Sequence, residues 1–122
     1  MLTGRVLDVG CYTGFLYHYL GKPAGYTGVD TWQEAIDVAR EFAPEADFRV
    51  LDGLEVKETY DVIWSSQILW NRGAGPRDAI EKLRKIAKTL IMVLAHDEAR
   101  YIEDCRPIEA GKLQIFIYEG SC

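Results

Sequence analysis

The stretch that decides the fold is Val6–Leu16, which reads VLDVGCYTGFL. Its first four residues belong to the mostly apolar run Arg5–Val9, which predicts a buried strand. Glycines at positions 10 and 14 follow, and these can adopt positive φ and allow a ligand to approach the backbone. A helix that begins directly after such a turn directs its free N–H groups at whatever is bound there. We therefore interpret Val6–Leu16 as a strand, a glycine-rich binding loop and the start of a helix.

Similar apolar runs recur along the chain, at Tyr26–Val29, Phe48–Leu51, Tyr60–Trp64 and Thr89–Leu94. They are mostly continuous and not alternating, which is typical of parallel strands that are buried on both faces. Near the C-terminus, Cys105–Ile108 and Lys112–Tyr118 predict an antiparallel hairpin. The expected fold is α/β, a three-layer doubly wound sheet of about seven strands, mostly parallel, with this hairpin at its end.

Helical patterns separate the runs. Residues Trp32–Phe42 carry an apolar stripe, and Thr31 and Glu34 have the spacing of a capping box at its start. Two further apolar stripes predict helices: a shorter one of Phe15, Leu16, Tyr19 and Leu20, closed by Gly21, and one of Ala79, Ile80, Leu83, Ile86 and Ala87 after Pro76. We also expect a loop or single turn over Gly53–Thr59 and a short helix over His96–Glu103.

Composition limits the class of protein. With 122 residues, 48% hydrophobic and 27% charged, the chain reads as one globular domain over residues 1–122. Its net charge of -5 argues against nonspecific binding to nucleic acid or to an anionic membrane. The three cysteines lack CxxC spacing, so we expect neither a disulfide framework nor a metal site, and we expect a cytoplasmic location. The apolar runs are too short to span a bilayer.

Carboxylates stand where the predicted strands end. Asp30 follows Tyr26–Val29, and Asp52-Gly53 follows Val50-Leu51. Ligands of such sheets bind beyond the carboxyl ends of the strands, where an acid can accept hydrogen bonds from a ribose diol. Asp30 could instead cap the next helix, and Asp52-Gly53 could be an ordinary turn. Ser65 adds a small polar group at the end of the fourth strand.

Together these motifs resemble the class I S-adenosylmethionine-dependent methyltransferases, over nearly the whole chain. The order Asp8-x-Gly10-x-x-x-Gly14, Asp30 and Asp52 carries the resemblance. It implies S-adenosylmethionine as the cofactor, with Asp30 at the ribose hydroxyls and Asp52 near the adenine amino group. The cofactor-binding residues that it implies are Asp8, Gly10, Tyr12, Gly14, Asp30, Thr31, Trp32, Asp52, Gly53 and Ser65. Tyr12 stands where the family commonly has another glycine.

The reaction so implied is methyl transfer to an unidentified acceptor. In-line displacement depends mainly on alignment, and we assign no catalytic residue. His96 could act as a base but is better explained as a solvated loop residue. Two other functions stay open. One is a non-catalytic nucleotide-binding or interaction module that acts with a partner subunit, whereas in the enzyme a homodimer could enclose a small-molecule acceptor. The other is a nicotinamide-dependent oxidoreductase, which the spacing Gly10…Gly14 disfavours because it is not G-x-G-x-x-G.

Overall fold

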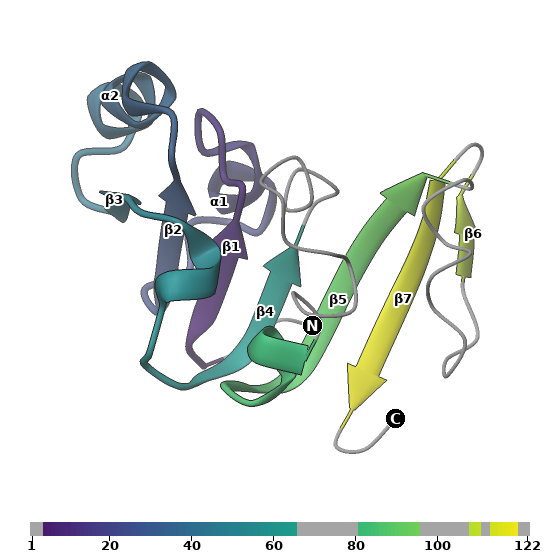
Figure 1. The fold of residues 1–122 in the computed structure, drawn as a ribbon. Helices are drawn as coiled ribbons and strands as arrows, with labels where there is room; N and C mark the ends of the chain where they lie inside the picture. Colours follow the sequence, from purple (N-terminus) through teal and green to yellow (C-terminus); the bar gives the residue numbers. More distant parts are fainter. Residues whose placement is uncertain (1–3, 66–80, 96–107, 111–112, 120–122) are drawn as a thin grey trace.

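A single sheet organises the molecule, in the strand order β3-β2-β1-β4-β5-β7-β6 (Figure 1). The computed structural model describes residues 4–65, 81–95, 108–110 and 113–119. The strands are β1 (Val6–Val9), β2 (Tyr26–Asp30), β3 (Asp47–Val50), β4 (Tyr60–Ser65), β5 (Ala87–Ala95), β6 (Ile108–Ala110) and β7 (Leu113–Glu119). Strands β1 to β5 are parallel, which confirms the predicted α/β class with a parallel sheet.

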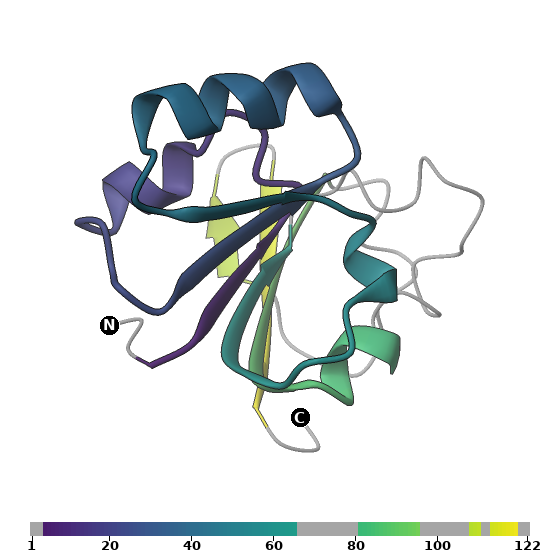
Figure 2. The same ribbon diagram turned by 90° about the vertical axis from the view of Figure 1, so that its left-hand side faces the viewer.

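Two layers cover the sheet. The helices α1 (Phe15–Tyr19) and α2 (Gln33–Phe42) lie on one face, and the 3-10 turn η1 (Gly53–Glu55) and the helical residues 81–84 lie on the other (Figure 2). Alternate residues of β1 serve the two faces, since Leu7 belongs to one buried cluster and Val6 to the other. The short turn expected within Gly53–Thr59 is therefore part of the second layer.

The antiparallel end of the sheet consists of β7 and β6. Strand β7 pairs with β5, with Ile91 opposite Ile117, and β6 pairs with β7, with Ile108 opposite Ile115. The described part of the first strand of this pair, Ile108–Ala110, shares only Ile108 with the expected Cys105–Ile108. Residues 105–107 lie outside the described residues, as do the predicted helix over His96–Glu103 and the position of Pro76.

The apolar stripe that ends in Ile86 and Ala87 is wrongly predicted as a single helix. Residues 81–84 are helical, residues 85 and 86 form a turn, and Ala87 already begins β5 opposite Tyr60. Leu83 is fully buried, as the stripe implies. Ile86 and Ala87 pack against the same cluster from the turn and the strand, so burial alone made them look helical.

The stripe predicted for α1 is right for Leu16, which packs against the cluster under the helices, and wrong for Phe15 and Tyr19. Phe15 and Tyr19 are 81% and 86% exposed, whereas Tyr17 is buried. The Tyr17 ring lies 5.1 Å from that of Tyr26, and its hydroxyl donates to Glu45 at 2.6 Å. Aromatic residues occur on both sides of this five-residue helix, and only contacts with distant strands select the buried side.

The predicted capping box is also wrong. The N-cap of α2 is Trp32, and no side chain caps the helix there. Asp30 instead contacts the N-cap residue, because its Oδ1 accepts the backbone N–H of Trp32 at 3.0 Å. The helix consequently starts one residue later than the spacing of Thr31 and Glu34 indicates.

Candidate functional site

The carboxyl ends of four parallel strands meet at one edge of the sheet. Strand β1 lies between β2 and β4, so the chain reverses its direction of strand addition here, and such switch points are where α/β sheets bind ligands. The backbone links the loops that follow these strands. Gly10 donates to the carbonyl of Val29 at 2.9 Å, and Leu51 donates to that of Asp30 at 2.9 Å. The edge therefore brings the glycine-rich loop, Asp30 and Asp52 together, as predicted.

The glycine-rich loop is held in left-handed conformations. Gly10 has φ +78° and Gly14 has φ +90°. A Cβ on Gly14 would lie 2.7 Å from the ring of Phe48, so this glycine allows the loop to pack onto β3. Tyr12 adopts φ +53°, a region that favours glycine. A positive φ at this position explains why glycine would be favoured there. Tyr12 adopts the same backbone conformation with some steric strain.

Asp30 ties the two loops of the site together. Its Oδ2 accepts the backbone N–H of Tyr12 at 3.0 Å, and its Oδ1 accepts that of Trp32 at 3.0 Å. The side chain is only 6% exposed. A carboxylate has about four acceptor positions, so among the described residues these two bonds leave two positions unused. Asp30 therefore joins the glycine-rich loop to the segment that precedes α2.

Two aromatic side chains, Tyr12 and Trp32, lie next to each other at this edge. The rings of Tyr12 and Trp32 lie 5.4 Å apart between centroids and are tilted by 42°. They are about half exposed, at 49% and 50%. Their own backbone N–H groups are the ones that Asp30 accepts, so a single carboxylate holds the backbone from which both side chains extend. The result is a half-exposed apolar wall beside a carboxylate.

Asp52 caps η1 and still has a free oxygen. Its Oδ1 accepts the backbone N–H of Leu54 at 3.0 Å, whereas within the described residues Oδ2 has no hydrogen-bond partner. The side chain is half-buried. Gly53 is buried, and any Cβ there would overlap the Val9 side chain. The structure thus explains Gly53 by its close packing on Val9.

Asp8 lies beneath this edge, inside the layer under α1 and α2. It is 3% exposed, and Tyr26 donates its hydroxyl to Oδ2 at 2.5 Å. Burial raises the pKa of Asp8 to about 7, and repulsion from Asp30 adds to this while the Tyr26 hydrogen bond opposes it. The same burial raises the pKa of the Cys11 thiol above its usual range, with Asp8 and Asp30 contributing. Asp8 is therefore a buried acid within reach of the charge of Asp30, and unlike Tyr12 and Trp32 it is not exposed at the edge.

Tyr26 and Gly28 are residues that the sequence reasoning missed. Gly28 is the register partner of Asp8, and a Cβ on it would lie 2.9 Å from the Tyr26 hydroxyl and 2.8 Å from Phe48. The missing side chain allows the Tyr26 ring to cross over and reach Asp8. The sequence did contain a signal for this contact. Tyr26 and Gly28 are two residues apart and so share one face of their strand, next to the strand that carries Asp8.

The other predicted residues lie at the same edge. Ser65 is fully buried opposite Val9 in β4, and Thr31 is half-buried. His96 lies outside the described residues. In the part of the chain that the structure describes, no three acidic, histidine or cysteine side chains gather as metal ligands would. No helix within those same ranges has the length and apolar character needed to cross a membrane.

The comparison with protein families decides the assignment. The family described as "Methyltransferase domain" matches residues 6–90, from the start of β1 into β5. The chain belongs to this methyltransferase domain family. The match covers the glycine-rich loop and all the strand ends described above. No curated protein matches the sequence of this methyltransferase domain.

Solved structures of methyltransferases share the fold. WbdD, a bifunctional kinase-methyltransferase, is similar with a TM-score of 0.76 and 22% identity over 96% of this chain and 35% of its own. The ribosomal protein L11 methylase of Lactobacillus delbrueckii subsp. bulgaricus gives 0.74 and 20% over 96% and 69%. Magnesium protoporphyrin IX methyltransferase of Synechocystis PCC 6803, solved with bound S-adenosylmethionine, gives 0.71 and 20% over 93% and 68%. The methyltransferase domain thus spans a minor part of WbdD and about two thirds of the other two chains.

Proposed function

We propose that this chain binds S-adenosylmethionine and transfers its methyl group to an acceptor, as one domain over residues 1–122. The observation that carries the proposal is the meeting of the Gly10 loop, Asp30 and Asp52 at the ends of adjacent strands. Membership of the methyltransferase domain family supports it. The antiparallel β7 and β6 at the edge of a parallel sheet agree with the resemblance and support it further.

The residues at this edge suit an adenosyl ligand. Asp30 keeps two acceptor positions for a ribose diol, and Oδ2 of Asp52 is free, among the described residues, to accept from an exocyclic amine. The half-exposed rings of Tyr12 and Trp32 offer an apolar surface for a flat base. The left-handed Gly10 allows close approach to the backbone. Thr31 borders the same edge.

Four of the implied residues contribute by shaping the site. Gly14 and Gly53 fit against Phe48 and Val9, and Asp8 and Ser65 are buried in the sheet. In this proposal they hold the loops in place and do not touch the ligand. The cofactor supplies an electrophilic methyl group on a sulfonium. The protein then has to bind the adenosyl part and align the acceptor, which lowers the barrier by proximity and orientation.

Calorimetry with S-adenosylhomocysteine tests the proposal. The wild-type protein is expected to bind, and Asp30→Ala is expected to weaken binding by about 1–3 kcal/mol, because a charged hydrogen-bond acceptor is lost. Asp37→Ala is the matched control, since Asp37 is an exposed residue of α2 whose side chain accepts only from Gln33 among the described residues. Urea denaturation verifies that each variant is folded. Absence of binding to the wild-type protein, or equal weakening in both variants, contradicts the proposal.

A further inference from the structure

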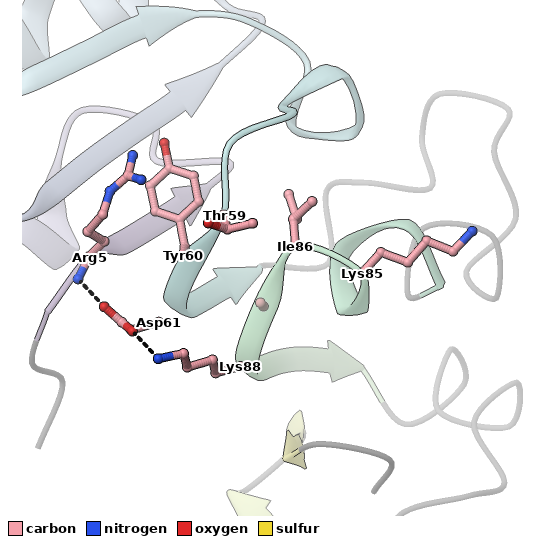
Figure 3. Close-up of a pocket in the computed structure, with 8 residues that line it drawn as sticks. Arg5, Thr59, Tyr60, Asp61, Lys85, Ile86 and Lys88 are labelled. Atoms are coloured by element: carbon pink, nitrogen blue, oxygen red, sulfur yellow. Dashed lines mark hydrogen bonds and ion pairs between the residues drawn. The ribbon is translucent and has the colours of Figure 1, made fainter.

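Charged residues line the hollow where β1, β4 and β5 begin, and most of them already have partners. Asp61 accepts the backbone N–H of Arg5 at 2.8 Å and lies 3.3 Å from Nζ of Lys88 (Figure 3). The guanidinium carbon of Arg5 lies 4.6 Å from the centre of the Tyr60 ring. These contacts join the starts of the three strands, which gives this charged hollow a structural role.

A different surface, on α1 and the end of α2, is apolar and exposed. Phe15, Tyr19 and Phe42 are 81%, 86% and 73% exposed, the highest values for large hydrophobic side chains in the part of the chain that the structure describes. Figure 2 shows α1 beside the end of α2, in the layer to which all three residues belong. Single exposed apolar side chains are common on soluble proteins, whereas a contiguous group of them marks a binding surface.

Two hollows make these side chains contiguous. Phe15 and Phe42 line one of them, which has a volume of about 240 Å³. Phe15 and Tyr19 line the other, of about 450 Å³. Phe15 belongs to both hollows, which therefore form one continuous surface. We call it the α1 surface, and its other lining residues are Thr13, Leu16, His18, Leu20 and Trp64.

The α1 surface has the area that a pair of chains needs. An aromatic side chain can bury about 150–250 Å², so the exposed fractions of Phe15, Tyr19 and Phe42 leave about 500 Å² uncovered on each chain. Two copies that cover these rings with each other bury about 1,000 Å² from the rings alone, which reaches the lower limit for specific interfaces. The half-buried lining residues of the larger hollow add to this area.

The charges around the α1 surface favour a second copy over a charged partner. None of the described residues that line it is an acid, a lysine or an arginine. A net charge of -5 opposes contact between copies wherever acids face each other, and this surface avoids that repulsion. Interface cores are depleted of charge and rich in aromatic residues in the same way. A basic peptide or an anionic membrane finds no complementary charge here.

We propose that the α1 surface binds the α1 surface of a second copy of this chain, in a two-fold symmetric pair. In such a pair the same residues face each other across the axis, so one surface has to supply both the inserted side chain and the hollow. Tyr19 is almost fully exposed beside a hollow of about 450 Å³, and an apolar cavity of about 150 Å³ already accepts a benzene ring. A ring of each copy therefore enters the hollow of the other. The contact involves neither Asp30 nor Asp52, and so it does not depend on the proposed methyl transfer.

Sedimentation equilibrium over a range of protein concentrations tests the proposal. The wild-type chain is expected to show a reversible equilibrium between one and two copies. Tyr19→Glu is expected to raise the dissociation constant of the pair by about tenfold or more, because an aromatic anchor is replaced by a charge. Tyr19→Phe keeps the ring and is expected to retain the pair. Because Tyr19 is exposed in the single chain, Tyr19→Glu is expected to fold, which urea denaturation verifies.

Thr59→Glu is the matched control, because it adds the same charge at an exposed residue of the charged hollow, outside the α1 surface (Figure 3). A wild-type chain that stays monomeric at every concentration, or equal weakening in Tyr19→Glu and Thr59→Glu, overturns the proposal. Oligomers that grow beyond two copies would exclude the two-fold arrangement. If Tyr19→Glu does not fold, Phe42→Glu takes its place in this comparison.

Two further measurements separate this proposal from its alternatives. Binding of a monomeric wild-type chain to neutral phosphatidylcholine vesicles, lost in Tyr19→Glu, would overturn the pair and assign the α1 surface to a membrane. S-adenosylhomocysteine binding is expected to be unchanged in Tyr19→Glu. Failure of the pair is therefore distinguishable from failure of the proposed methyl transfer.

Discussion

The hydroxyl of Tyr26 reaches Oδ2 of Asp8 at 2.5 Å, across the neighbouring strands β2 and β1. Both groups are buried, and the bond passes over Gly28, which has no side chain to block it. The carboxyl group lies directly below the loop that Asp30 holds, and repulsion from Asp30 reaches it. Stability of the proposed binding edge is therefore linked to one buried acid and its phenol partner.

Removal of the phenol hydroxyl tests this link. Tyr26→Phe is expected to lower the free energy of unfolding by about 1–3 kcal/mol, because the buried Asp8 loses its hydrogen-bond donor. Tyr60→Phe is the matched control, since Tyr60 is equally buried but its hydroxyl makes only a 3.4 Å bond to the partly exposed Glu58. Urea denaturation at pH 7 measures both. An equal decrease in the free energy of unfolding in the two variants would show that the hydrogen bond to Asp8 contributes no extra stability.

The raised pKa of Asp8 predicts a pH dependence. The folded protein keeps the proton up to a pKa of about 7, whereas the unfolded chain releases it near 3.8. Between these values the folded state binds more protons, so the contribution of Asp8 to stability is greatest below pH 4 and falls as pH rises to 7, by up to about 1.4 kcal/mol per unit. Asp8→Asn mimics the protonated acid. Its stability relative to wild type is expected to improve from pH 4.5 to pH 7, and a difference that stays constant would exclude the raised pKa.

The backbone at Tyr12 predicts different effects for two substitutions. Tyr12→Val is expected to cost about 1–2 kcal/mol of stability, because a β-branched residue is strained at φ +53°. Tyr12→Gly removes that strain but also the ring contact with Trp32, and the net change is expected to stay within about 1 kcal/mol. Thermal unfolding of the two variants side by side measures this. A valine variant as stable as the glycine variant would argue against the left-handed conformation.

Asp52 allows its two roles to be separated. Asp52→Asn retains an oxygen for the N–H of Leu54 and is expected to change stability by less than about 0.5 kcal/mol. The same change places an amide donor where an adenine amino group would donate, so affinity for S-adenosylhomocysteine is expected to fall about tenfold. Asp52→Ala is expected to lose both stability and affinity. If Asp52→Asn binds as tightly as wild type, Asp52 serves only as the cap of η1.

Much of the fold follows from local pattern. The apolar runs around Leu7, Val29 and Ile63 predict buried parallel strands, because they lack the alternation of apolar and polar residues that a strand with one solvent-exposed face shows. Chain order then places Asp30 and Asp52 at one edge without any knowledge of contacts, because parallel strands all end on the same side. The predicted helix boundary is wrong where an apolar residue fits either a helix or another element. Ile86 and Ala87 pack against the core from a turn and a strand, not from a helix.

The sequence by itself thus determined the layered α/β architecture and the edge at which acids and glycines gather, since both depend on spacing along the chain. Tertiary structure alone decided which side chains far apart in the sequence come into contact. The partners of Asp8 and Tyr12, namely Tyr26 and Asp30, are each 18 residues away. No local period encodes a contact of that kind. It arises when neighbouring strands pair and bring two distant side chains together away from water. This is why Asp8 is a buried acid here and why Trp32, not Thr31, is the N-cap of α2.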